Sequence, residues 1–178
     1  GPARASGPAE LAIQYDTATG AGWGIAGAKG ITGGRKGYKA SLFEGGINVP
    51  FLARWPGKIA ANQIDDQSLI SAVDLLPTFC ELAGAKLPDG YAPDGVSQVA
   101  VLKGKPAPVR KTPLFWKHLS PWPAQKHKPE HWVSWAVVDQ KWKLVANKDG
   151  SHVELYHLGR DPYEVQDVAK DFPEELAK

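Results

Sequence analysis

A lysine, an acid and a pair of glycines stand at fixed offsets before an apolar run, and no other segment constrains the fold as strongly. Lys39 is followed by Glu44, Gly45 and Gly46, and then by the run Pro50-Phe51-Leu52-Ala53-Arg54-Trp55-Pro56-Gly57. A glycine pair lets the backbone pass close to other chain or to a ligand, where a Cβ would not fit. The apolar run predicts a strand over residues 51–53, inside a sheet. We expect the Glu44 carboxylate to anchor the turn before this strand by accepting backbone N–H groups.

This segment resembles the sulfatase family, in which a K-x4-E-G-G-x-x-x-P pattern leads into a strand ending in W-P-G. Further matches to the family are the D-L-L-P-T run from Asp74, the D-G-x-S turn from Asp94, the W-K-L-V run from Trp142 and the E-L-Y-x-L and D-P-x-E motifs from Glu154 and Asp161. Together these motifs extend the resemblance over nearly the whole chain from Gly33 onward.

The resemblance implies an α/β fold class. Residues 1–110 would form the end of a sulfatase/alkaline-phosphatase-like α/β domain, with residues 1–37 as a glycine-rich loop region. Residues 111–178 would form a small four-stranded antiparallel sheet with a C-terminal helix. The residues themselves predict strands over 113–117, 132–138, 142–147 and 152–158, because β-branched and aromatic side chains are enriched there. A helix is predicted to begin after Phe172, with acids in its first turn.

A second helix is predicted where Asp74 precedes an apolar stretch. Asp74 is the expected N-cap, Pro77 fits the first turn, and Gly84 supplies the stop. Leu75, Leu76, Phe79, Cys80 and Ala83 fall on one helical face, so this helix is expected to pack into a core. The residues before it, 68–73, are predicted to be a short apolar strand or an approach segment.

Hydrolysis of a sulfate ester is the activity that the resemblance implies. Charge builds on the bridging oxygen as the S–O bond breaks, and an ammonium held close favours that transition state. The resemblance gives this role to Lys39, with Glu44, Gly45 and Gly46 as structural residues at the site. Family members also use a formylglycine, made from a C/S-x-P-x-R motif, and a calcium ion. This chain has no such motif, since Cys80 is followed by Glu81-Leu82-Ala83-Gly84.

The nucleophile and the metal ligands are therefore expected upstream of Gly1, in an N-terminal part of the same sulfatase. Gly1-Pro2 is either the tail of the family's Asp-Asn-Gly-Pro run, whose Asp and Asn bind the metal, or a protease scar. No metal ligand is assigned within the chain. On this interpretation the chain alone is inactive and belongs to a longer enzyme acting on a sulfated small molecule or glycan.

Two further side chains are candidate substrate contacts. His118 follows an expected strand and could donate a proton to a leaving alkoxide, because imidazole changes charge near neutral pH. Trp122 could stack on a sugar ring. His127 and His131 are four residues apart, but Pro129 lies between them and argues against a helical metal site.

Composition excludes some partners. The formal net charge is +2, from 21 basic and 19 acidic residues, so no broad basic surface for nucleic acid is expected. No apolar run approaches the roughly 20 residues of a membrane span. The family is by habit periplasmic or secreted, while the chain itself indicates no compartment. Two alternatives remain: a phosphodiesterase or phosphonate hydrolase of the same superfamily, and a non-catalytic carbohydrate-binding or interaction module.

Overall fold

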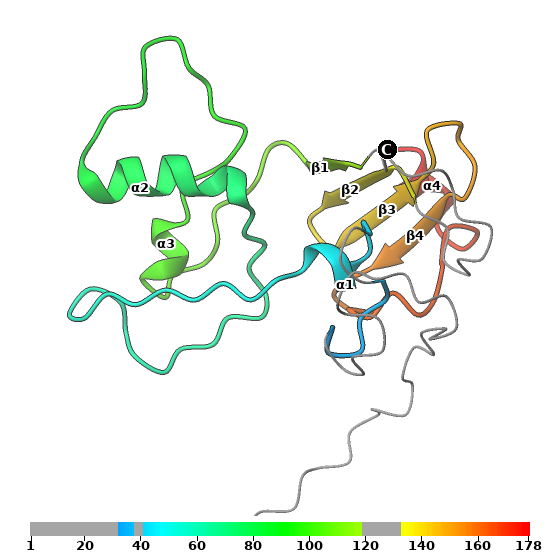
Figure 1. Cartoon of the computed structure of the whole chain (residues 1–178), viewed down its shortest axis with the longest axis horizontal. Helices are drawn as coiled ribbons and strands as arrows, with labels where there is room; N and C mark the ends of the chain where they lie inside the picture. The colour runs from blue at the N-terminus through cyan, green and yellow to red at the C-terminus, as the bar shows by residue number, and fades with distance from the viewer. Residues whose placement is uncertain (1–31, 38–40, 119–132) are drawn as a thin grey trace, which may run out of the picture. The chain divides into compact units, whose positions relative to one another are not determined.

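The computed structural model describes residues 32–37, 41–118 and 133–178 (Figure 1). The chain divides into two compact units. One unit, called the sheet unit, combines the chain up to Val49 with Phe115–Lys178, and the other, called the helical unit, is Pro50–Leu114. Of the described residues before Pro50, 32–37 and 41–49 group with the sheet. The division into an α/β part over residues 1–110 and a β subdomain over residues 111–178 stays a prediction.

The sheet unit is built on four strands that follow one another in the chain. They are β1 (Leu114–Lys117), β2 (Trp135–Asp139), β3 (Trp142–Ala146) and β4 (Glu154–His157), in the spatial order β1-β2-β3-β4. β3 pairs antiparallel with both β2 and β4, with Val137 opposite Leu144 and Leu144 opposite Leu155. The four predicted strands are therefore present, with ends shifted by a few residues.

The core of the sheet unit follows from alternation along the strands. Ala136 and Val138 of β2 and Val145 of β3 are buried, whereas Val137 and Leu144, which alternate with buried residues, are half-buried. Leu42 and Phe43, which precede the short helix α1 (Glu44–Ile47), join this core together with Tyr156. Residues that follow position 39 in the chain are thus packed into the core of the sheet unit.

The predicted terminal helix is present as a single turn, α4 (Pro173–Leu176), with Glu174 and Glu175 in its first turn. The residue before it, Phe172, contacts Trp142 of β3 with ring centroids 5.0 Å apart. The Trp142 ring also meets His157 edge-on at 4.7 Å. These ring contacts tie the end of the chain to the sheet.

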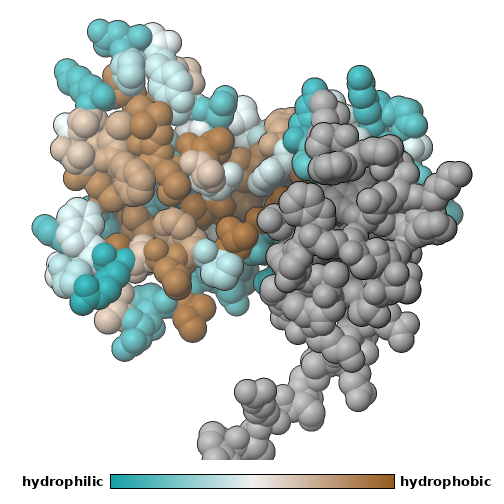
Figure 2. All heavy atoms as spheres, in the orientation of Figure 1, coloured by the Kyte–Doolittle hydropathy of each residue, from teal (hydrophilic) through white to brown (hydrophobic). Residues whose placement is uncertain are grey.

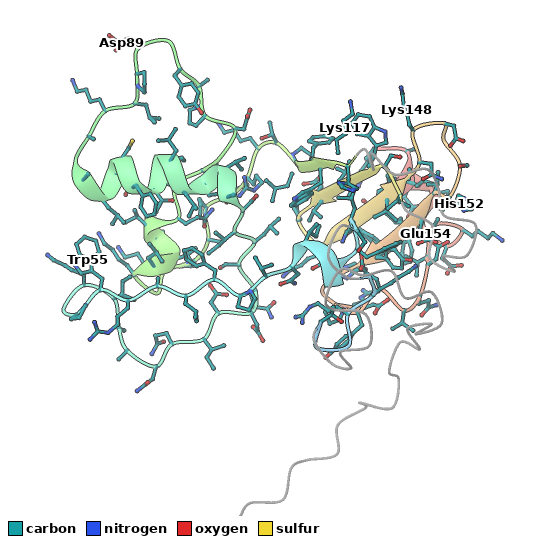
Figure 3. All side chains as sticks on the ribbon, viewed as in Figure 1. Trp55, Asp89, Lys117, Lys148, His152 and Glu154 are labelled. Carbon is teal, nitrogen blue, oxygen red and sulfur yellow. The ribbon has the colours of Figure 1, made fainter. Side chains whose placement is uncertain are left out.

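The helical unit contains the 3-10 helix η2 (Ala72–Asp74), α2 (Leu75–Ala83) and α3 (Val99–Leu102). α2 ends as predicted at Gly84, whose φ of 64° is the left-handed conformation that glycine adopts readily. Trp55 lies beside α3, where Val99 and Leu102 line the same pocket (Figure 3).

Asp74 occupies the position before α2, but its carboxylate does not cap that helix. Oδ2 instead accepts the Ser71 N–H at 2.8 Å and pairs with Arg110 Nη2 at 2.6 Å, and Oδ1 accepts the Val96 N–H at 2.8 Å. The predicted N-cap is therefore the fully buried anchor of three segments of the helical unit.

The strand predicted over residues 51–53 is wrong for the described structure. Of the two alternatives for residues 68–73, a strand or an approach segment, the strand is wrong. Neither segment lies in a strand, and Leu52 is 92% exposed. A strand needs a hydrogen-bonded neighbour, and the described residues of the helical unit include no strand to pair with these segments. The predicted packing of the α2 apolar face is also wrong here, since Leu76 and Phe79 are exposed, and Figure 2 shows hydrophobic surface gathered over this unit.

Candidate functional site

The loop that carries Lys39, defined as residues 37–43 and called the Lys39 loop, is closed at its base by backbone contacts. Gly45 donates its N–H to the Lys36 carbonyl at 2.7 Å, so the residues flanking the loop meet. α1 then begins, with the Asn48 N–H donating to the Glu44 carbonyl at 2.9 Å. Lys39 itself lies outside the described residues, and its place in the loop is given by the sequence alone.

Gly45 stands where the two sides of the loop base touch. A Cβ at this position would clash with the carbonyl oxygens of Lys36 and Gly37. The close backbone passage predicted for the glycine pair is thus present at Gly45. Gly46 lies within α1, and its N–H donates to the Phe43 carbonyl at 2.8 Å.

Glu44 anchors the segment, but through side-chain donors instead of the predicted backbone N–H groups. Its Oε1 accepts a hydrogen bond from Lys143 Nζ at 2.8 Å, and its Oε2 accepts one from Asn48 Nδ2 at 2.8 Å. The Glu44 backbone N–H in turn donates to Glu164 Oε2 at 2.6 Å. The difference arises because the N–H groups of Gly45 and Gly46 donate to backbone carbonyls, whereas the buried Lys143 ammonium needs a carboxylate partner.

A buried ion cluster, called the Lys143 cluster, consists of Lys143, Glu44 and Glu164. Lys143 Nζ lies 2.8 Å from Glu164 Oε1 as well as 2.8 Å from Glu44 Oε1, and the side chains of Lys143 and Glu164 are 0% exposed. Burial raises the pKa of Glu164, and Lys143 opposes that rise. Two carboxylates thus share one ammonium inside the sheet unit.

A second group of charges lies at the other side of the loop base. Lys36 Nζ donates to Glu154 Oε2 at 2.9 Å and to the Tyr156 hydroxyl at 2.8 Å, and it lies 4.2 Å from the centre of the Phe43 ring. Glu154 is labelled on β4 in Figure 3. Burial, together with the Glu154 carboxylate, raises the pKa of the Tyr156 hydroxyl, which therefore stays protonated and donates to Glu154 at 2.5 Å.

Sequence reasoning missed Lys143 and Glu164. Both stand in quoted motifs, W-K-L-V and D-P-x-E, but received no role. The available signal was the period-two alternation of β3, which places Lys143 on the same face as Val145. A charged side chain on the apolar face of a strand requires a buried partner of opposite charge.

Of the two predicted substrate contacts, the structure describes only His118. His118 directly follows β1, is half-buried, and donates its backbone N–H to the Ser134 carbonyl at 2.9 Å. Its role as a proton donor stays a prediction. Trp122, His127 and His131 lie outside the described residues.

Within residues 32–37, 41–118 and 133–178, no group of three or more His, Cys, Asp or Glu side chains is arranged to hold a metal ion. In the same ranges no helix is long and apolar enough to cross a membrane.

Comparison with known proteins places this arrangement in a family. The family model described as N-sulphoglucosamine sulphohydrolase, C-terminal, matches residues 35–176. A protein named sulfatase from Formosa agariphila is 31% identical over 140 residues, which are 76% of this chain and 25% of that protein. Arylsulfatase K of Mus musculus is 31% identical over 144 residues, 79% of this chain and 25% of that protein.

Solved structures agree with these matches. Ps i-CgsB superposes with a TM-score of 0.63 at 29% identity, covering 80% of this chain and 29% of that one. The Bacteroides thetaiotaomicron protein BT33336S-sulf gives a TM-score of 0.62 at 26% identity, covering 82% and 30%. The chain spans about a quarter of the length of the curated relatives it matches. With its four-stranded sheet and terminal helix, this chain belongs to the sulfatase family and corresponds to the family's C-terminal region.

Proposed function

We propose that the protein containing this chain hydrolyses sulfate esters and that Lys39 contacts the sulfate group. The observation that carries this proposal is the family match over residues 35–176, which includes the K-x4-E-G-G segment and the closed base of the Lys39 loop. Membership of the sulfatase family supports sulfate ester hydrolysis as the reaction. The hydrogen-bonded base supports a loop whose ends are held in fixed positions.

The chemistry requires a cation near the sulfate oxygens. An ammonium is a compact point charge, and it stabilises the charge that develops as the S–O bond breaks, most strongly where water is excluded. His118 would supply the proton for the leaving alkoxide, and Trp122 would contact the organic part of the substrate.

Formylglycine and calcium enter the proposal through residues that precede this chain. The formylglycine would supply the nucleophile, and the calcium ion would supply the charge that holds the sulfate oxygens. The described residues offer no cluster suited to the metal. The exposed apolar side chains of the helical unit, such as Leu52 and Phe79, fit a surface that packs against that preceding part.

The substrate class is inferred to be a sulfated small molecule or glycan. Similar proteins include an N-acetylgalactosamine-6-O-sulfatase of Bacteroides thetaiotaomicron and a steryl-sulfatase of Homo sapiens. Because these names span a sugar and a sterol, the shared chemistry is the sulfate ester alone.

The test compares hydrolysis of an aryl sulfate by the full-length protein and by Lys39→Ala, with folding verified for both. We expect kcat/KM to fall by about 100-fold or more, equivalent to about 3 kcal/mol of transition-state stabilisation. Lys148→Ala is the matched control, because Lys148 is an exposed lysine in the turn after β3, and its activity should not change.

The outcomes separate the alternatives. An active wild type with an unaffected Lys39→Ala would remove Lys39 from the site while keeping the reaction. Faster turnover of an aryl phosphate or phosphonate ester than of the sulfate would favour the phosphodiesterase or phosphonate hydrolase. No turnover of either ester, with calcium present and formylglycine verified by mass, would favour a binding module.

A further inference from the structure

Lys143 is a charged residue in the middle of a strand with no exposed side-chain surface. Its ammonium contacts two carboxylates, Glu44 Oε1 and Glu164 Oε1, each at 2.8 Å. Glu44 begins α1 immediately after the Lys39 loop, whereas Glu164 closes the turn 161–164 that follows β4. The Lys143 cluster therefore joins three segments that are far apart in sequence.

Stability alone is a poor reason for such a cluster. Removing ions from water costs free energy that their mutual attraction repays only in part, and apolar replacements are often as stable. Glu164 adds a second cost, because its φ of 57° is a left-handed conformation that residues other than glycine rarely adopt. The cluster thus combines two unfavourable features, buried charges and a left-handed Glu164. Together they indicate that the cluster serves to fix the positions of the segments it joins.

The turn 161–164, which contains Glu164, contacts both ends of the Lys39 loop. At its end, the Glu44 N–H donates to Glu164 Oε2 at 2.6 Å. Before its start, the Lys36 N–H donates to the Tyr163 carbonyl at 3.2 Å, and Lys36 Nζ pairs with Glu154 at 2.9 Å. The turn 161–164 thus receives one hydrogen bond from each side of the loop base.

We propose that Lys143 is a positioning residue for sulfate ester hydrolysis: by holding Glu44 and Glu164 together, it fixes the base of the loop that carries Lys39. This inference rests on the proposed function of Lys39. Lys143 itself touches no substrate, and its effect on the reaction passes through the placement of the loop.

A double-mutant cycle in the full-length protein tests this coupling. The four proteins are wild type, Lys143→Met, Lys39→Ala and the double variant, and the assay is hydrolysis of nitrophenyl sulfate, an activated ester. We expect Lys143→Met to lower kcat/KM by about 10-fold or more when Lys39 is present and by less than about 2-fold when Lys39 is absent. The loss should fall mainly on kcat, because the transition state is more sensitive to the position of the ammonium than the ground state is.

A second variant covers the case in which Lys143→Met does not fold. Glu164→Gln keeps the size of the side chain and an oxygen for the Glu44 N–H while it weakens the pairing with Lys143. It should show the same dependence on Lys39, with a loss of about 5-fold or more in its presence.

Arg110→Met is the matched control, since it breaks a buried ion pair of the helical unit, Arg110 Nη2 to Asp74 Oδ2 at 2.6 Å. Its kcat/KM per folded molecule should stay within about 2-fold of wild type. Equal losses from the Lys143 or Glu164 variants in both Lys39 backgrounds, or an equal loss from Arg110→Met, would overturn the positioning role while leaving Lys39 in place. An unaffected Lys39→Ala in an active enzyme would overturn the proposed role of Lys39, and the positioning role with it, while sulfate ester hydrolysis itself would stand.

Discussion

At the scale of single residues, Glu164 links the fold to pH. Burial raises its pKa above the ordinary 4.5, with the Glu44 carboxylate adding to the rise and Lys143 opposing it. A raised carboxyl pKa means that the folded state binds a proton that the unfolded state has released. The stabilising contribution of this proton is complete below pH 4.5 and is lost as pH rises through the folded pKa.

Glu164→Gln should remove that part of the pH dependence. The amide stays neutral, so the difference between wild type and variant in free energy of unfolding should change with pH above about 4.5 and level off above the raised pKa. Urea unfolding of the full-length protein at several pH values measures it. Glu174→Gln, at an exposed position of α4, is the control. A wild-type-minus-variant difference that does not vary with pH would contradict the raised pKa.

At the scale of elements, prediction succeeded where the signal is local. The strands β2, β3 and β4 follow from alternation and β-branched residues, and the end of α2 follows from Gly84. It failed at residues 51–53 because an apolar run identifies a strand only if a neighbouring strand exists to pair with it. It missed Lys143 because no local pattern tells which distant carboxylates a buried ammonium will meet.

The loop base gives a prediction that belongs to this scale. Gly45→Ala places a Cβ against the carbonyl oxygens of Lys36 and Gly37, so the two sides of the base must separate. We expect a loss of about 1–3 kcal/mol in free energy of unfolding, together with a lower kcat/KM for the sulfate ester. Chemical unfolding and aryl sulfate kinetics on the full-length protein measure both effects.

Gly84→Ala is the matched comparison for Gly45→Ala. A Cβ at Gly84 meets nothing within 4 Å, so the variant carries only the strain of its φ of 64°, about 1 kcal/mol. Its activity should equal that of wild type. If Gly45→Ala is as active as Gly84→Ala, the close approach at the loop base has no bearing on catalysis.

At the scale of the whole molecule, the two units differ in how completely they bury their apolar residues. The sheet unit has a core of buried side chains from β2, β3 and β4, joined by Leu42 and Phe43, which precede α1. The helical unit leaves Leu52 92% exposed and Phe79 59% exposed. Because the chain spans about a quarter of its curated relatives, these side chains fit a surface that the rest of a sulfatase covers in the proposed full-length enzyme.

Leu52→Asp tests that proposal by comparing two proteins that share the same substitution. In the isolated chain it should change the free energy of unfolding little, because the side chain already faces solvent. In the full-length protein it should cost about 2 kcal/mol or more, since the same side chain would be buried there. Equal effects of Leu52→Asp in both proteins would mean that no preceding part covers this surface.

The isolated chain should also show no aryl sulfate turnover with added calcium, because it has no C/S-x-P-x-R motif to provide a formylglycine. Turnover by the isolated chain would mean that its own residues supply the nucleophile, contrary to the proposed division of the active site.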